Sequence, residues 1–415
     1  MSKAPDILTF GCRLNTYESE VMRNHATALD DVIIVNTCAV TAEAERQARQ
    51  AIRRAHRDRP TARIVVTGCA AQIDPARWSG LPGVTRVLGN EEKLRAESWS
   101  EASLGAGDAV SDIMAARETA AHLVTEFAGR TRAFVQVQQG CDHRCTFCII
   151  PFGRGPSRSV AVGAVVEQVR ALVRAGYREV VLTGVDITSW GGDLPGQPAL
   201  GQLCRRLLAL VPELERLRLS SVDPVEIDED LWVLLAHEPR FMPYLHLSLQ
   251  AGSDMILKRM KRRHLVEDAA RVIARARGLR PEIGIGADVI AGFPTETEAL
   301  FEETLAFVRD QQLPYLHVFP YSERPGTPAA RMPAIDKASR KARAASLRAV
   351  GEATLGAYLA TLRGRTLRVL METETSGHSE EFAPVRLASG TAEVGRILTL
   401  RAAAVDGGTL LAETV

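Results

Sequence analysis

The sequence lacks an apolar run of the length that crosses a membrane. Its first residues, MSKAPDILTFGC, also lack the charged and then apolar pattern of a signal peptide. We therefore expect a cytoplasmic protein without a membrane partner. At 415 residues the chain is too long for one ordinary core, so two or three domains are expected.

Cysteine is scarce, and the seven residues present are spread too thinly for a disulfide framework. In a reducing compartment such residues more often hold metal or do chemistry. Three of them, Cys141, Cys145 and Cys148, share eight positions, and no fourth cysteine lies nearby. Structural zinc sites and iron–sulfur clusters take four protein ligands, whereas a cubic cluster on three thiolates leaves one iron open for chemistry. His143 could complete a zinc site, but its short tether between two cysteines gives awkward geometry.

Three further cysteines lie far apart, and each follows a short aliphatic run: LTFGC ends at Cys12, IIVNTC at Cys38 and VVTGC at Cys69. If these runs are parallel strands of one sheet, their carboxyl ends meet at one edge, where ligands gather in open α/β sheets. Three thiols would then converge there, again without a fourth. A buried structural thiol is the alternative for any single one of them. Cys204, among leucines at helical spacing, is expected to be a core residue.

The alternation of apolar and amphipathic segments predicts an α/β protein of three domains. Residues 1–125 have the βαβ pattern of an N-terminal doubly wound parallel sheet, with a linker at 101–130. Residues 126–355 suit a full or partial (β/α) barrel with chemistry at the carboxyl ends of its strands. Residues 356–415 predict a small antiparallel β barrel. The expected strands of the central barrel are 132–138, 178–184, 216–221, 244–250, 283–292 and 315–321.

The segment GCDHRCTFC, with Phe147 directly before Cys148, resembles the cysteine signature of radical S-adenosylmethionine (radical SAM) enzymes. Together with the N-terminal cysteines, the resemblance narrows to the methylthiotransferases and covers the whole chain. That family combines an N-terminal three-cysteine domain, a radical SAM barrel and a small RNA-binding barrel of the TRAM type. The chain is most similar to the MtaB type, through GCRLNTYESE, NTCAVT, LTGVDITSWG, LHLSLQAGSDMILKRMKRRH, AGFPTET and HVFPYSERPGTPAARMP.

This resemblance implies a reaction. Enzymes of that type convert N6-threonylcarbamoyladenosine at position 37 of tRNA, 3′ of the anticodon, to its 2-methylthio derivative. No side chain has a pKa suited to removing an aromatic hydrogen of adenine, so cofactor-borne radical chemistry is needed. The resemblance implies two [4Fe-4S] clusters and two uses of S-adenosylmethionine. One use is reductive cleavage at the catalytic cysteines Cys141, Cys145 and Cys148. The other is methylation of a sulfur held at Cys12, Cys38 and Cys69.

Polar residues at the ends of barrel strands are the expected contacts of S-adenosylmethionine. TGVD at 183–186 resembles the superfamily segment that meets the methionine amino group. Two serines and a glutamine end later strands and would face the same mouth, although any of them could be a turn or capping residue. The expected cofactor contacts are Phe147, Thr183, Gly184, Asp186, Ser221, Ser248 and Gln250.

Positive charge is concentrated in three stretches of a chain whose net charge is only +1. Residues 45–63 hold seven Arg against two acids, residues 253–280 nine Lys and Arg against three, and residues 331–368 nine against two. A charge run is usually a solvated face, but three of them favour a polyanion partner. We expect that partner to be the anticodon stem-loop of tRNA. The C-terminal barrel is not basic, with six Arg against seven acids at 363–415.

Other interpretations stay open. A methylthiotransferase of the same family could act on isopentenyl-adenosine in tRNA or on an aspartate of a ribosomal protein. A non-catalytic iron–sulfur protein that senses redox state and binds RNA would normally use four protein ligands. Only 25 residues separate Cys12 from Cys38, fewer than expected for the family, so a helix or loop is expected to be trimmed there. An electron donor such as flavodoxin or ferredoxin, a sulfur source and a monomeric state are further expectations.

Overall fold

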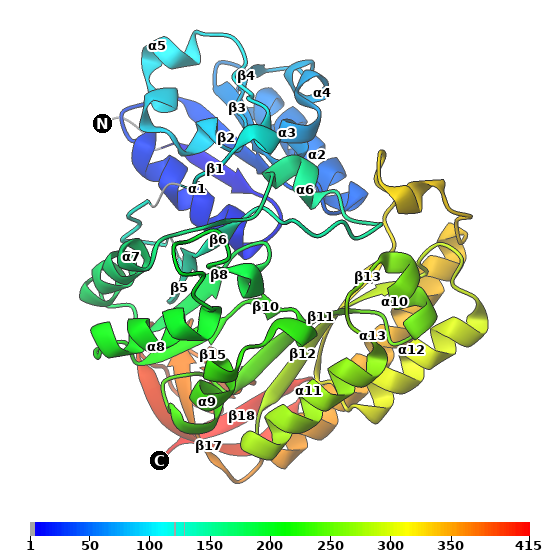
Figure 1. Ribbon diagram of the computed structural model, residues 1–415. Helices are drawn as coiled ribbons and strands as arrows, with labels where there is room; N and C mark the ends of the chain where they lie inside the picture. The colour runs from blue at the N-terminus through cyan, green and yellow to red at the C-terminus, as the bar shows by residue number, and fades with distance from the viewer. Residues whose placement is uncertain (1–4, 120–121, 128) are drawn as a thin grey trace.

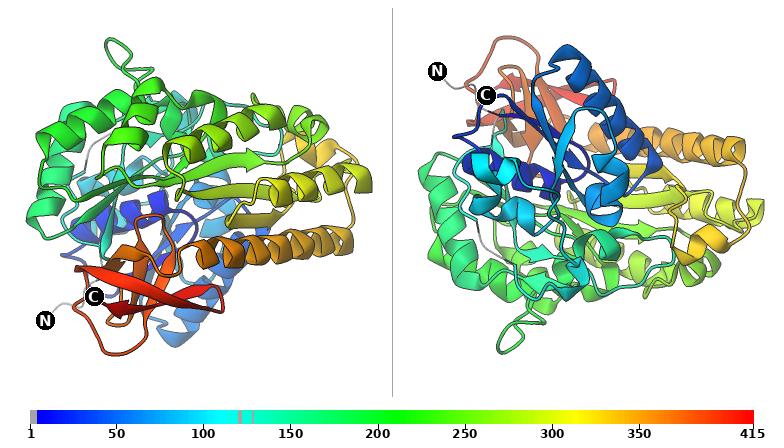
Figure 2. Two further views of the ribbon diagram at one scale, coloured as in Figure 1. Left: turned by 90° about the horizontal axis from the view of Figure 1, so that it is seen from below. Right: turned by 90° about the horizontal axis from the view of Figure 1, so that it is seen from above.

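The computed structural model describes residues 5–119, 122–127 and 129–415, which form three modules (Figure 1). An N-terminal α/β module lies over one end of a central α/β module, and a small β barrel lies on the opposite side (Figures 1 and 2). Residues 120–121 and 128, within the expected linker, lie outside the described residues. Among the described residues, no helix is long and apolar enough to cross a membrane.

The N-terminal module is built on a parallel sheet whose strands follow one another in chain order, β1-β2-β3-β4. Its strands are β1 (Asp6–Thr9), β2 (Val32–Thr37), β3 (Arg63–Gly68) and β4 (Val84–Val87), and its long helices are α1 (Arg13–His25) and α2 (Ala42–Asp58). β2 begins with an apolar run and is buried along its whole length, as expected for a strand covered on both faces. The doubly wound parallel sheet is therefore confirmed.

The two long helices cover opposite faces of this sheet. Met22 of α1 shares an apolar cluster with Ile34 of β2, whereas Ile52 of α2 clusters with Ile33, which points to the other face. Because β1, β2 and β3 are neighbours in chain order, helices on opposite faces require two connections of opposite hand. Crossovers between parallel strands are right-handed in about 98% of cases. One of the two connections therefore departs from the rule.

Short elements complete this module and lead into the linker. They are α3 (Cys69–Ile73), α4 (Pro75–Ser79), η1 (Glu92–Leu94), η2 (Ala96–Trp99), α5 (Glu101–Leu104) and η3 (Ile113–Ala115). The described part of the linker contains no named strand, although Ala109 makes an isolated parallel bridge with Leu88. The start of the linker thus stays attached to the N-terminal sheet.

The central module contains the six predicted strand segments, arranged as an open (β/α) barrel. One sheet has the order β5-β8-β9, and the next has the order β10-β11-β12-β13. The strands are β5 (Arg132–Gln136), β8 (Glu179–Thr183), β9 (Arg216–Leu219), β10 (Ser221–Val222), β11 (Tyr244–Gln250), β12 (Gly284–Ala291) and β13 (Tyr315–Pro320). The main helices are α7 (Val162–Arg174), α8 (Leu200–Leu210), α9 (Glu229–His237), α10 (Asp254–Met260), α11 (Val266–Leu279), α12 (Glu298–Asp310) and α13 (Lys337–Thr361). The barrel is partial rather than full.

The C-terminal module is a closed barrel of order β14-β15-β16-β18-β17. Its strands are β14 (Thr366–Met371), β15 (Ser376–Ser379), β16 (Pro384–Leu387), β17 (Ile397–Asp406) and β18 (Thr409–Thr414). The apolar runs TLRVLM, APVRLA, RILTLR and TLLAE predict four of these strands from the sequence, whereas β15, with residues SGHS, shows no apolar alternation and was not predicted. One pair differs from a purely antiparallel barrel: β16 and β18 run parallel, because a long segment separates β16 from the final hairpin.

This C-terminal barrel docks at the amino ends of the central strands. Arg216 and Arg218 of β9 are buried, pair with Glu179 at the start of β8, and donate to backbone carbonyls of the barrel. Burial alone would raise the pKa of Glu179, but the charges of Arg218 and Arg216 hold that pKa at about 2. Phe382 of the barrel lies against Tyr244 at the start of β11, with ring centroids 4.9 Å apart. The N-terminal module lies at the opposite side, where the central strands have their carboxyl ends (Figure 1).

Candidate active site

Three cysteines follow the three adjacent parallel strands β1, β2 and β3. This N-terminal trio consists of Cys12, Cys38 and Cys69. Because neighbouring parallel strands end at the same edge, the three thiols lie together there. Burial, and then the neighbouring sulfurs of Cys69 and Cys12, raise the pKa of the Cys38 thiol to about 12.

Glycine precedes two members of the N-terminal trio, and the backbone requires it at both positions. Gly11 has a φ of +101°, and a Cβ there would lie 2.8 Å from the Cys38 sulfur. Gly68 has a φ of +95°, and a Cβ there would collide with the backbone oxygen of Thr37. Only glycine takes such conformations without strain. The two Gly-Cys pairs therefore let the strand ends close around the sulfurs.

A second set of cysteines lies in one loop between β6 (Gln138–Gln139) and α6 (Ile150–Arg154). This loop trio consists of Cys141, Cys145 and Cys148. The loop is fixed to the end of α10, because the Thr146 hydroxyl and amide donate to backbone carbonyls there at 2.8 and 3.0 Å. It also turns tightly, since the Cys148 amide donates to the Cys145 carbonyl at 3.1 Å.

The residues of both trios fit an iron–sulfur cluster. All six are free thiols, and burial raises the pKa of Cys148 to about 12. A thiol of raised pKa becomes a thiolate once a metal takes the place of its proton. Three thiolates from one loop, or from one sheet edge, suit a cubic cluster with one open iron.

His143, considered above as a fourth ligand, is held by acidic residues. Its Nε2 lies 2.9 Å from Asp186, and hydrogen bonds to Asp186 and Glu226 raise the pKa of His143 to about 10. The guanidinium of Arg263 lies 2.7 Å from the same Nε2, so this nitrogen already has polar partners within the protein. Asp186 in turn lies 3.8 Å from the Cys141 sulfur. The pair therefore forms a polar wall beside the loop trio.

A buried cluster of charges lies directly behind the N-terminal trio. Glu18 of α1 pairs with Lys93 at 2.7 Å and with Arg154 at 2.5 Å, and all three side chains are excluded from solvent. Burial alone would raise the pKa of Glu18, but the charges of Arg154 and Lys93 hold that pKa at about 2. Arg154 also donates from Nε to the Cys69 sulfur at 3.2 Å. With two cations for one carboxylate, the cluster presents positive charge to the Cys69 sulfur.

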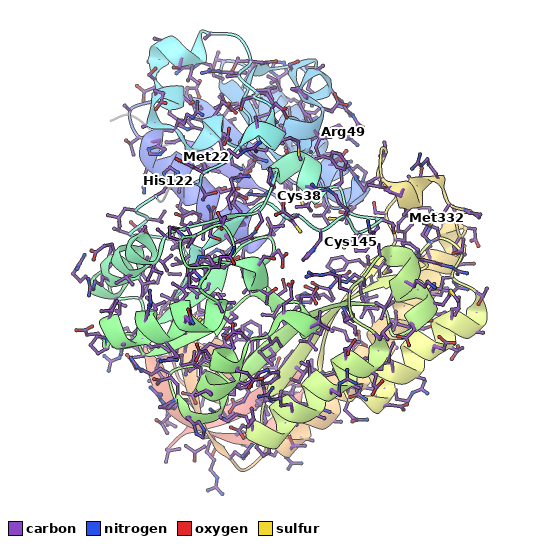
Figure 3. All side chains as sticks on the ribbon, in the orientation of Figure 1. Met22, Cys38, Arg49, His122, Cys145 and Met332 are labelled. Carbon is purple, nitrogen blue, oxygen red and sulfur yellow. The ribbon has the colours of Figure 1, made fainter. Side chains whose placement is uncertain are left out.

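The two trios are neighbours in space. Arg154 ends α6, the helix that follows the loop trio, and α6 packs on α3, the helix that begins at Cys69. Gly153 permits this packing, since a Cβ there would lie 3.1 Å from the Cys69 Cβ. Figure 3 shows Cys38 and Cys145 on facing sides of the space between the N-terminal and central modules.

A second buried arginine serves the loop trio. Arg262 points Nη1 at the Cys145 sulfur, 3.6 Å away, and Nη2 donates to Asp223 and to the Ser248 carbonyl, both at 2.8 Å. By sequence, Arg262 belongs to the KRMKRRH run that was expected to face RNA. Nothing in a run of five basic residues marks the one that turns inward, because the turn after α10 decides it.

A cavity of about 450 Å³ opens between the N-terminal module and the mouth of the central barrel. Its lining includes Cys12, Arg13, Cys38, Thr183, Gly184, Ser221, His246, Asp288 and His317. Two cysteines of the N-terminal trio and the carboxyl ends of the barrel strands therefore share one space. Such a cavity between domains is the usual setting of a substrate site.

The expected contacts of S-adenosylmethionine take several positions. Thr183, Gly184 and Ser221 line the cavity. Asp186 lies beside the loop trio, and Ser248 offers its carbonyl to Arg262, as described above. Two others lie apart: Phe147 packs on the apolar cluster around α10, and Gln250 ends β11 with a φ of +72°. All seven remain predictions as cofactor contacts.

A chain of polar side chains lies inside the barrel and was not predicted from the sequence. His246 and His317 both hydrogen-bond Oδ1 of Asp288, at 3.1 and 3.2 Å, and the Tyr244 hydroxyl lies 2.8 Å from His246 Nδ1. Two imidazoles and a carboxylate this close could hold a cation, but here they satisfy one another. The available signal was a His or Asp inside each of three mainly apolar strands, YLHLSLQ, GIGADVIA and YLHVFP.

Many residues of the three basic stretches are engaged in ion pairs. Arg46 pairs with Glu43 at 2.5 Å, and Arg275 pairs with Glu229 at 2.6 Å. Some exposed basic residues have no carboxylate within 4 Å in the described parts of the chain. These include Arg53, Lys258, Lys261, Arg331, Lys337 and Lys341. The charge available to a polyanion is therefore smaller than the sequence suggests.

Two families match parts of this chain. Residues 135–308 match the radical SAM superfamily, and residues 6–89 match a family described as uncharacterized protein family UPF0004. The first match implies a [4Fe-4S] cluster and S-adenosylmethionine. A similar fold is seen in the radical S-adenosylmethionine methyltransferase TsrM of Kitasatospora setae, solved with tryptophan and a SAM analogue. The TM-score is 0.52 at 15% identity, over 86% of this chain and 70% of that one.

Curated relatives match the chain along most of its length. Threonylcarbamoyladenosine tRNA methylthiotransferase MtaB of Rickettsia prowazekii (strain Madrid E) is 50% identical over 97% of this chain and 96% of that protein. The MtaB of Bacillus subtilis (strain 168) is 36% identical over 90% and 86%. A tRNA-2-methylthio-N(6)-dimethylallyladenosine synthase of Maricaulis maris (strain MCS10) is 37% identical over 88% and 86%. The chain therefore belongs to the radical S-adenosylmethionine methylthiotransferases, and within them to the MtaB family.

Proposed function

We propose that this protein converts N6-threonylcarbamoyladenosine at position 37 of tRNA to its 2-methylthio derivative. The observation that carries the proposal is the single cavity bordered by Cys12 and Cys38 and by the strand ends of the radical SAM barrel. A cavity that joins two cysteines of the N-terminal trio to the mouth of the radical SAM barrel would let hydrogen removal and sulfur delivery occur at the same base. The relative from Rickettsia prowazekii, 50% identical, is named for this substrate.

The loop trio would hold one [4Fe-4S] cluster and the N-terminal trio a second. Bound there with S-adenosylmethionine, they supply the radical chemistry and the methylated sulfur that no side chain provides. The protein holds the ligands in place: Arg154 and Arg262 each point an N–H at a cysteine sulfur. Thr183, Gly184 and Ser221, which line the cavity, are proposed to orient S-adenosylmethionine from the barrel side.

The proposed RNA partner is the anticodon stem-loop. A base in that loop is already unpaired, so little energy is needed to present it to a recessed site. The exposed basic residues without ion-pair partners would contact phosphates, which makes binding weaken with salt. A flavodoxin or ferredoxin as electron donor, a separate sulfur source and a monomeric state complete the proposal.

A second candidate substrate is dimethylallyl-adenosine (isopentenyl-adenosine) in tRNA, because the relative from Maricaulis maris is named for it. The cavity argues against this candidate. Its barrel side carries His246, Asp288 and His317, and its other side carries Arg13. His246, Asp288 and His317 already pair with one another, but an apolar dimethylallyl group would leave Arg13 without a partner, whereas a threonylcarbamoyl group offers it a carboxylate. The family assignment favours an enzyme over a redox sensor.

Mass spectrometry of tRNA nucleosides tests the proposal. A strain lacking the protein should accumulate N6-threonylcarbamoyladenosine and lack its 2-methylthio derivative, and a plasmid carrying the wild-type chain should restore the product. A plasmid carrying Cys145→Ala serves as the control for catalysis. An unchanged level of this nucleoside, with loss of the methylthio form of dimethylallyl-adenosine, would transfer the assignment to the second candidate.

A further inference from the structure

Arg13 is half-buried and has no acidic partner among the described residues, unlike the arginines that lie beside the two cysteine trios. It is the first residue of α1 and lines the cavity directly after Cys12. No carboxylate lies within 4 Å of its guanidinium in the residues that the structure describes, whereas Arg154 pairs with Glu18 and Arg262 with Asp223. Burial lowers the pKa of Arg13, but a guanidinium stays charged at neutral pH.

The surrounding groups leave this charge available. Asp288 is the one acidic side chain among the described residues that line the cavity. Its Oδ1 accepts from His246 and His317, and it lies far enough from Arg13 to influence it only through space. Arg13 is half-buried, and a partly desolvated cation without a bonded anion is costly. The missing partner of Arg13 is therefore an anion that enters the cavity.

We propose that Arg13 binds the carboxylate of the threonyl group on the substrate base. This inference rests on the proposed function and deepens it, because it makes Arg13 the residue that selects an N6 substituent ending in a carboxylate. A guanidinium offers two parallel N–H donors to a carboxylate, and such charge-assisted pairs are stronger than neutral hydrogen bonds.

The chemistry of adenine agrees with this placement. C2 and the carbon that bears N6 flank N1 on one edge of the ring, so a substituent on N6 stays close to the atom that is modified. Arg13 is adjacent in sequence to Cys12 of the N-terminal trio, the side from which sulfur is delivered in the proposed function. Binding the carboxylate there would hold the same edge of the base toward the N-terminal trio.

Another carboxylate could reach the same guanidinium. S-adenosylmethionine carries one on its methionine part, so the test must separate the two sources. The substrate can be varied chemically: an anticodon stem-loop with N6-threonylcarbamoyladenosine is compared with the same loop carrying the threonine methyl ester. The ester adds one methyl group and removes the charge.

The experiment combines these two loops with full-length reconstituted wild type, Arg13→Met and Arg13→Lys. Arg174→Met is the matched control, because Arg174 is exposed at the end of α7, away from the cavity. Readouts are loop affinity by fluorescence anisotropy, kcat/KM for the methylthio product, binding of S-adenosylmethionine by equilibrium dialysis, and iron per chain.

Wild type and Arg174→Met should bind the acid loop about 10- to 100-fold more tightly than the ester loop, which is the contribution of a charge-assisted hydrogen bond to affinity. Arg13→Met should lose that preference with iron content and S-adenosylmethionine binding retained, and Arg13→Lys should regain part of it. If wild type does not distinguish the loops, or Arg13→Met still does, the assignment is overturned. Loss of S-adenosylmethionine binding in Arg13→Met would instead assign the guanidinium to the methionine carboxylate. Failure of wild type to modify either loop would contradict the proposed function itself.

Discussion

The two cysteine trios of this protein reach similar surroundings by different routes. The loop trio lies within eight positions of one loop, whereas the N-terminal trio runs from Cys12 to Cys69 and depends on three strands. In each trio a buried arginine points an N–H at one sulfur, Arg154 at Cys69 and Arg262 at Cys145. The comparison shows that a local motif carries its own geometry, while a site made by a sheet depends on the packing of the whole domain.

The largest expected effect is that removing a cysteine from either trio abolishes a different step of the reaction. Cys145→Ala should abolish formation of 5′-deoxyadenosine from S-adenosylmethionine, whereas Cys38→Ala should retain it and lose the methylthio product. The reason is that each variant removes one ligand from a different cluster, so iron per chain should fall by about half in both. Both products are measured by mass spectrometry in anaerobic reactions with reductant.

Cys204→Ala is the matched control, since Cys204 is a buried core residue of α8 outside both trios. It should keep the iron content and both products. Continued 5′-deoxyadenosine formation by Cys145→Ala would contradict the role given to the loop trio, and its loss in Cys38→Ala would show that the trios are not separate.

The next effect concerns the dependence of the N-terminal trio on backbone geometry. Gly11→Ala should lower the free energy of unfolding by about 2 kcal/mol and remove the iron of this trio, because a Cβ at φ +101° meets the Cys38 sulfur. Gly107→Ala is the control, since nothing lies within 4 Å of a Cβ there. Denaturant unfolding and iron analysis measure the two effects. Full iron content in Gly11→Ala would show that the strand ends can separate without losing the site.

A third difference lies in the pH dependence of stability. The pKa of Glu18 is about 2 in the folded protein, below the ordinary carboxyl value of 4.5. A depressed folded pKa stabilises the fold above the unfolded pKa, and this contribution is lost as the pH falls from 4.5 to 2. Glu18→Gln should therefore flatten the loss of stability across this window, by an amount of the order of 3 kcal/mol.

Glu179 provides the internal comparison, because its pKa is also about 2 but it joins the central module to the C-terminal barrel. Urea unfolding from pH 2 to pH 6 should show a flattened profile in both Glu18→Gln and Glu179→Gln. Only Glu18→Gln should also lose iron, since Arg154 links Glu18 to Cys69. Equal iron loss in both variants would mean that the N-terminal trio responds to global stability alone.

The smallest effect concerns the surface near the loop trio. Replacing Lys258 and Lys261 together with alanine should weaken stem-loop binding several-fold and lower the salt slope by about 1 to 2, because each exposed ammonium would release about one counterion. Arg271→Ala is the control, since Arg271 pairs with Glu267 at 2.7 Å. Fluorescence anisotropy over a salt series gives both quantities. Equal effects from Arg271 would show that ion pairing does not decide which charges meet RNA.

Most of the architecture could be predicted from the sequence, for reasons that particular elements make clear. The apolar run in VIIVNT predicts a strand that is covered on both faces, as the structure shows. The loop trio could be recognised because its three cysteines are close together in the sequence. β15 was missed because SGHS has no alternation, and a register in a closed barrel is set by neighbouring strands. The sequence also could not predict that the connections through α1 and α2 have opposite hands, since both segments have the pattern of ordinary amphipathic helices.

By itself, the sequence determined the three modules, the two cysteine trios and the family to which they belong, because periodicity and local spacing are written directly in the order of residues. Only the tertiary structure decided which charged side chains are paired inside the protein and which stay available. It buried Glu18 with Lys93 and Arg154, turned Arg262 inward from a basic run, and left Arg13 without an acidic partner in the described part of the cavity. The physical reason is that a charge's energy depends on its neighbours and its access to water, and both are set by residues far away along the chain.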